Sequence, residues 1–121
     1  MVDLYIWIGK AYTLMKNDDK AIKYFEMALK DKPNSSKALF NLGKIYEKKR
    51  KMKLAKENYQ KAIDINPRYT DALNNLGGIF KRGKNYDAAI KCFKQATMYN
   101  STLIIAYANL GFCFIKIGNY R

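Results

Sequence analysis

Apolar residues recur along the whole chain at the three- and four-residue spacing of amphipathic helices. Short polar or glycine-containing turns, such as residues 16–18 and 83–85, separate successive runs. The pattern therefore predicts an all-α protein built from antiparallel helix pairs. The two clearest runs are Leu39, Leu42, Ile45 and Tyr46, followed by Ala55, Tyr59, Ala62 and Ile63.

The same pattern returns at a fixed interval of 34 residues, which is typical of stacked repeats rather than of a globular fold. Glycines coincide when the sequence is shifted by this interval, and so do aromatic residues three positions later and again in the second half of each copy. The coinciding sets are Gly9, Gly43, Gly77 and Gly111, then Tyr12, Tyr46, Phe80 and Phe114, and finally Phe25, Tyr59 and Phe93.

The recurrent glycine lies inside a predicted helix, where Gly is less favourable than Ala by about 1 kcal/mol. Because every copy has glycine here, we infer that there is too little room for a side chain at this position. We expect two helix backbones to approach closely there, with the neighbouring aromatic residues filling the wider gaps.

The residues that recur also resemble a known family, the tetratricopeptide repeat. The resemblance implies a right-handed α-solenoid of about three and a half repeats in a single array over residues 1–121. Ser101 stands where a closing proline is expected, and residues 50–52 depart from the usual turn. The copies span 2–35, 36–69 and 70–103, with a first helix alone at 104–121, and the pattern is clearest in Leu39, Leu42-Gly43, Tyr46, Ala55, Tyr59, Ala62 and Pro67.

The amino-acid composition limits the kinds of metal, catalytic and cofactor site that the chain can form. The chain has no histidine, and Cys92 and Cys113 lie in no metal-ligand spacing, so we expect no metal site, no histidine-based catalysis and no cofactor. Two free thiols fit an intracellular protein, cytoplasmic or nuclear. No apolar run reaches the roughly 18 residues that span a bilayer, and the start lacks a basic leader. We therefore expect a non-catalytic protein without a transmembrane segment.

Both ends of the chain are strongly apolar. Residues 2–8 and 103–117 hold few polar side chains, although terminal units of a solenoid normally present polar outer faces. We expect the chain to be a fragment of a longer array that self-associates through its terminal helices.

The resemblance implies that a partner lies in the concave groove lined by the first helix of each copy. The sixth position of the copies holds Trp7, Asn41, Asn75 and Asn109. The three asparagines form a predicted ladder, whose amides can hold the backbone of an extended peptide.

Basic residues surround the ladder and would attract an acidic peptide, since the chain carries a formal net charge of +13. Trp7 and Phe40 are the candidate apolar anchors. The last helix places Phe112 and Lys116 at groove positions as well. The basic candidates are Lys10, Lys37, Lys44, Lys48, Lys81 and Arg82.

The sequence is also compatible with other functions. Residues 71–77 resemble repeats of protein O-glycosyltransferases, which would make the chain the substrate-recruiting part of a larger enzyme. The charge also permits an RNA-binding or membrane-surface array, and residues 48–53 could be a targeting signal or a nucleic-acid patch. Nucleic acid is disfavoured, because most aromatic residues occupy packing positions. A chaperone-type carboxylate clamp is disfavoured too, since only its middle asparagine is present.

Overall fold

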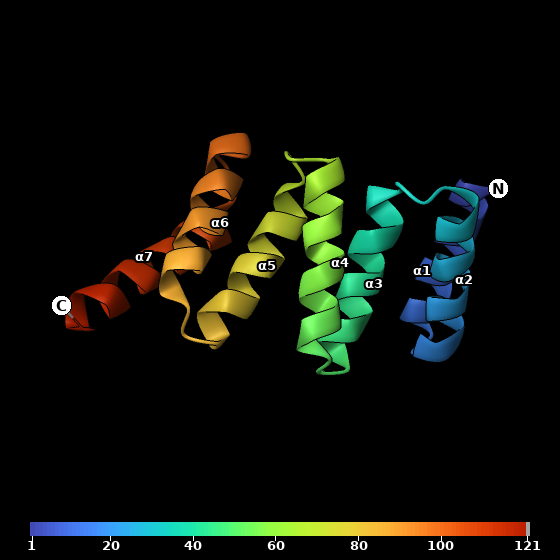
Figure 1. Cartoon of the computed structure of the whole chain (residues 1–121), viewed down its shortest axis with the longest axis horizontal. Helices are drawn as coiled ribbons and strands as arrows, with labels where there is room; N and C mark the ends of the chain where they lie inside the picture. The colour runs from blue at the N-terminus through green and yellow to red at the C-terminus, as the bar shows by residue number, and fades with distance from the viewer. Residues whose placement is uncertain (121) are drawn as a thin grey trace. The chain divides into compact units, whose positions relative to one another are not determined.

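The computed structural model describes residues 1–120, with side chains through Gly118, and these residues form helices and no strand (Figure 1). The all-α prediction is therefore confirmed. Contacts divide the chain into two compact units, Met1–Asn66 and Pro67–Arg121, called unit 1 and unit 2 below.

Unit 1 consists of two antiparallel helix pairs, α1 with α2 and α3 with α4, and α3 also packs on α2. The second helix begins where the Asn17 side chain accepts a hydrogen bond from the Lys20 amide, and the third where Ser35 accepts one from Ala38. Such caps satisfy amides that lack a partner within the helix. The bounds are Val2–Leu14 (α1), Asp18–Asp31 (α2), Ser36–Lys48 (α3) and Met52–Ile65 (α4).

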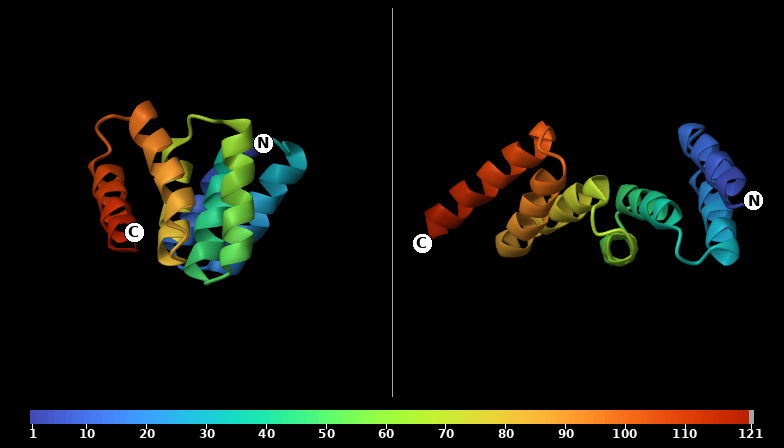
Figure 2. Two further views of the ribbon diagram at one scale, coloured as in Figure 1. Left: turned by 60° about the vertical axis from the view of Figure 1, so that its left-hand side comes forward. Right: turned by 90° about the horizontal axis from the view of Figure 1, so that it is seen from above.

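Unit 2 holds a third pair, α5 with α6, and a further helix, α7, which lies beside α6 and also contacts α5 (Figure 2). Asn85 caps α6 by accepting a hydrogen bond from the Ala88 amide. This cap falls at the same repeat position as Asn17, so the first and third repeats share it, whereas the second repeat has Lys51 there without a side-chain cap. The bounds are Thr70–Arg82 (α5), Tyr86–Tyr99 (α6) and Ile104–Tyr120 (α7).

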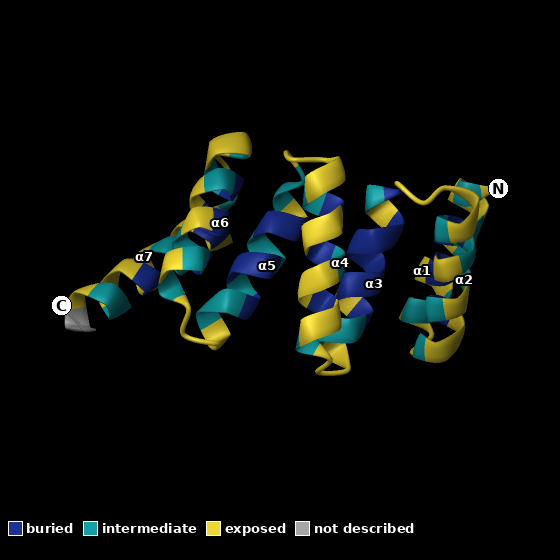
Figure 3. Cartoon of the chain, viewed as in Figure 1, coloured by how far each residue is buried: buried dark blue, intermediate teal, exposed yellow. Residues whose placement is uncertain are grey.

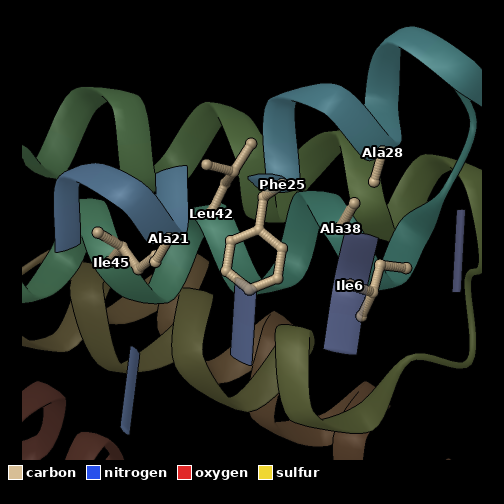
Figure 4. Close-up of a cluster of buried hydrophobic side chains, with 7 residues drawn as sticks. All are labelled: Ile6, Ala21, Phe25, Ala28, Ala38, Leu42 and Ile45. Atoms are coloured by element: carbon tan, nitrogen blue, oxygen red, sulfur yellow. The ribbon is translucent and has the colours of Figure 1, made fainter. Parts of the chain in front are cut away.

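The core of unit 1 forms where α1, α2 and α3 meet, around the fully buried ring of Phe25 (Figure 4). Burying an aromatic side chain removes a large apolar area from water and stabilises the fold by about 1.5–3 kcal/mol. The remaining members of this cluster are Ile6, Ala21, Ala28, Ala38, Leu42 and Ile45.

The recurrent glycines face aromatic rings rather than helix backbones. A Cβ built on Gly43 would lie 2.7 Å from the ring of Tyr59, and one on Gly9 or Gly77 would lie 2.7 Å from the ring of Phe25 or Phe93. The expectation of backbone contact was therefore wrong: the missing side chain makes room for a ring of the partner helix.

The turn within each helix pair contains one residue with a left-handed backbone. These residues are Lys16, Arg50 and Lys84, with φ angles of 61°, 63° and 64°, and they occupy equivalent places in the three repeats. Gly83, beside Lys84, has an ordinary φ of −81°. The turn thus demands an unusual conformation from a residue with a side chain.

Large apolar side chains are exposed on the first and last helices, whereas α3 is mostly buried (Figure 3). No helix among the described residues is long and apolar enough to cross a membrane. The exposed residues are Leu4, Trp7 and Leu14 on α1, and Ile104, Ile105, Tyr107, Phe112, Phe114 and Ile115 on α7.

Candidate functional site

The candidate residues on α1 are open to solvent. Trp7 is 67% exposed, and Lys10, one turn further along the helix, is exposed too. This tryptophan therefore contributes little to the packing of unit 1. Trp and Lys side chains on one helix face can provide an apolar anchor and a positive charge for a ligand.

The candidates on α3 are held by their own unit. Asn41 is buried, and its Nδ2 donates a 2.7 Å hydrogen bond to the Lys37 carbonyl one turn earlier. Phe40 is buried with its ring centroid 5.8 Å from that of Tyr59, and the Lys44 Nζ lies 5.2 Å from the Phe40 centroid. Phe40 therefore packs within unit 1, and its part as a ligand anchor stays a prediction. Lys37 and Lys44 are exposed.

Lys48 is neutralised within unit 1. Its Nζ lies 3.0 Å from a carboxylate oxygen of Asp18, and the Lys49 Nζ lies 3.3 Å from one of Asp19. These ion pairs join the end of α3 to the start of α2. The basic run at 48–53 thus has two of its cations engaged by carboxylates, which weakens it as a continuous patch.

The candidates in unit 2 come together where α5 and α7 meet. The Lys81 Nζ donates a 2.8 Å hydrogen bond to the Asn109 Oδ1 and lies 5.0 Å from the Phe112 ring centroid. The Lys116 Nζ lies 5.4 Å from the same centroid. Both distances are within the range of cation–π attraction.

The other unit 2 candidates lie nearby on α5. Asn75 is half-buried and Arg82 is exposed. Asn74 was missed by the sequence analysis: its Oδ1 is buried without a hydrogen-bond partner among the described residues. A polar residue where the other repeats have the apolar Ile6 and Phe40 was the signal that could have revealed it.

The carboxylates and cysteines of the described residues are the candidates for a metal or thiol site. They contain no group of three or more carboxylate or cysteine ligands able to hold a metal ion. Burial raises the pKa of the Cys92 thiol to about 11 and also raises that of Cys113, although the nearby Lys81 charge opposes the latter shift. Thiols with raised pKa values are poor nucleophiles at neutral pH.

Three matches to family models, each described as tetratricopeptide repeat, cover residues 2–35, 36–69 and 58–91. Together they span most of the chain. The chain belongs to the tetratricopeptide repeat family. Structures of this family are helical arrays without strands, which agrees with the helices described above.

Solved structures support this tetratricopeptide fold. A crystal structure of MamA has a TM-score of 0.88 and 24% identity, and the alignment covers 97% of this chain and 68% of that one. The pilF protein of Pseudomonas aeruginosa has a TM-score of 0.85 and 28% identity, with 97% of this chain and 54% of that one covered. The chain thus spans roughly half to two thirds of these relatives. No curated protein matches the sequence.

The predicted asparagine ladder crosses the two units of this tetratricopeptide chain, since Asn41 belongs to unit 1 and Asn75 and Asn109 belong to unit 2. Within unit 1, the Nδ2 of Asn41 is engaged by its own helix. Within unit 2, the Oδ1 of Asn109 is engaged by Lys81. The ladder stays a prediction.

Proposed function

We propose that this chain is a non-catalytic scaffold that binds an extended peptide segment of another intracellular protein along the first helices of its repeats. The observation that carries the proposal is the exposure of Trp7, 67%, at the repeat position that holds asparagine in the other copies. Exposed tryptophans are enriched among the residues that dominate binding energy at protein interfaces. Family membership supports the same function.

The predicted asparagine ladder would specify how the scaffold holds the backbone of its peptide. Asn75 and Asn109 would hold the peptide backbone in unit 2, while Asn41 is buried and already donates one of its two Nδ2 hydrogens to the Lys37 carbonyl. We expect the double change Asn75→Ala and Asn109→Ala to weaken peptide binding without loss of helix content. Unchanged affinity would remove the ladder from the mechanism.

The alternative, a substrate-recruiting array of a larger enzyme, would use the same helices and place catalysis in another domain. It rests on the resemblance of residues 71–77 to O-glycosyltransferase repeats alone. The scaffold proposal needs no further domain, so we favour it.

A selection from a random peptide library, unbiased in charge, tests the proposal. Trp7 is the sole tryptophan of the chain, so a selected peptide that covers it should shift the intrinsic fluorescence to shorter wavelength. Trp7→Ala should weaken binding by about tenfold or more, as at interface hot spots. Met98→Ala, which truncates an equally exposed side chain on α6, is the control and should have no effect. Failure to select any peptide, or equal effects of the two variants, would contradict the proposal.

A further inference from the structure

We propose that Lys81, Lys116 and Asn109 form a carboxylate-binding site at Phe112, which receives a Glu or Asp side chain of the bound peptide. The inference rests on the proposed function, because it names the chemistry recognised at one point of that surface. All four residues lie in unit 2, on α5 and α7.

The geometry concentrates positive charge at one ring. The Lys81 and Lys116 Nζ atoms lie 5.0 and 5.4 Å from the Phe112 centroid, so they are at most about 10 Å apart, within about one Debye length at 0.1 M salt. Lys81 uses one ammonium proton on the Asn109 Oδ1 and keeps two. An anion between these lysines would relieve their repulsion and accept those protons.

Unit 2 supplies no carboxylate for this purpose. Neither Lys81 nor Lys116 makes an ion pair with any residue that the structure describes, whereas Lys48 in unit 1 is paired with Asp18. The sequence explains the difference, since residues 67–121 hold eight basic residues and only two acidic ones, Asp71 and Asp87. The side chains of unit 2 therefore offer few carboxylates to these lysines, which leaves both able to bind an anionic group of another molecule.

A peptide carboxylate fits this site better than a nucleic acid does. Single-stranded nucleic acids bind by stacking bases on open aromatic faces. Phe112 has both lysine ammonium groups near its ring and the Tyr86 ring centroid 6.5 Å from its own, at a tilt of 60°. These three groups surround the ring and leave less room for a stacked base, yet the residue is 42% exposed, so a peptide side chain can reach the lysines.

The test compares two labelled peptides, octaglutamate and octaglutamine, both acetylated and amidated so that only side chains differ. The wild-type chain should bind octaglutamate and prefer it to octaglutamine. The double variant Lys81→Gln with Lys116→Gln should weaken octaglutamate binding by about tenfold or more, because two charge-assisted contacts are lost. The control Lys84→Gln with Lys91→Gln removes the same charge from exposed positions of unit 2 and should have a smaller effect.

A second pair of variants keeps the site's shape. Asn109→Asp places a carboxylate 2.8 Å from the Lys81 Nζ. This carboxylate should pair with Lys81 and so weaken the binding of octaglutamate. Asn85→Asp adds the same charge at a helix cap, where Asp is well tolerated, and should leave binding nearly unchanged. Circular dichroism would verify the fold of every variant.

Three results would overturn the inference: no preference for octaglutamate, equal losses in site and control variants, or oligouridine binding with the same dependence on Lys81 and Lys116. Any of these would leave the scaffold proposal intact if the unbiased selection still yields peptides that depend on Trp7. Conversely, selection of no peptide at all would contradict the scaffold itself.

Discussion

At the scale of single residues, the repeat is defined by a glycine in one helix and an aromatic ring in the next. The ring of Tyr59 is fully buried, and its hydroxyl donates a 2.8 Å hydrogen bond to a Glu47 carboxylate oxygen. A ring anchored in this way cannot move aside easily. The fourth glycine, Gly111, differs, because a Cβ at that position would meet nothing within 4 Å.

This contrast gives a matched pair of alanine substitutions. Gly43→Ala should destabilise the chain, because overlap with the Tyr59 ring costs about 1–3 kcal/mol and outweighs the gain of about 1 kcal/mol in helix propensity. Gly111→Ala should instead stabilise it by up to about 1 kcal/mol, since only the propensity changes. Urea unfolding followed by circular dichroism would measure both. A stabilising Gly43→Ala would show that the ring yields, against the packing described.

The left-handed turn residue gives a second matched pair. Lys84→Gly should raise the free energy of unfolding by about 1 kcal/mol, because a side chain at a φ of 64° is strained and glycine is not. Gly83→Ala should be nearly neutral, since φ is ordinary there and a Cβ would make normal contacts at 3.6 Å. Thermal unfolding of the two variants would decide the matter, and the reverse order of their midpoints would refute the turn geometry.

At the scale of helices, the 34-residue period sufficed to predict the helix pairs, because the period places equivalent apolar residues on each helix. It could not predict the environment of α3, where the six consecutive residues 38–43 are all buried. Because burial continues over more than one helical turn, the positions of Phe40 and Asn41 in the repeat could not show whether they face a groove.

The sequence likewise predicted the residues of the candidate site but not their contacts. Alignment of the repeats placed Lys48 and Lys81 among the basic candidates of the first helices. It could not show that Lys48 lies near Asp18 at the start of α2, while Lys81 lies near Asn109 and Phe112 of α7. Those contacts depend on which helix ends adjoin after folding, and they are separated by about 30 residues along the chain.

The buried thiol of Cys92 on α6 makes the stability of the folded chain depend on pH. Burial raises the pKa of Cys92 to about 11 in the folded chain, above its ordinary value near 9. The stability that the protonated thiol contributes is therefore fully present below about pH 9 and is lost as the pH rises through about 11. We expect the wild type to lose more stability than Cys92→Ala between about pH 8 and 10.5, measured by urea unfolding at each pH. Parallel curves for the two proteins would contradict a raised thiol pKa.

At the scale of the whole molecule, α7 has an apolar surface that remains exposed to solvent after the chain has folded. Ile104 and Ile115 are 81% and 65% exposed, and Gly111 between them faces open space. In the three complete repeats, the corresponding glycine is covered by an aromatic ring of the second helix. Contiguous exposed apolar patches on soluble domains mark interaction surfaces or association hazards.

We therefore predict that residues 1–121 self-associate through α7. Sedimentation velocity should show an average mass that rises with protein concentration, and Ile104→Glu with Ile115→Glu should abolish the rise by adding charge to the apolar surface. Because both side chains are exposed, the change should leave the fold of unit 2 intact. Lys84→Glu with Lys91→Glu changes the charge of unit 2 at exposed positions outside α7 and serves as the control. A wild type that stays monomeric at high concentration would show that this surface, although apolar, does not bind a second copy of itself.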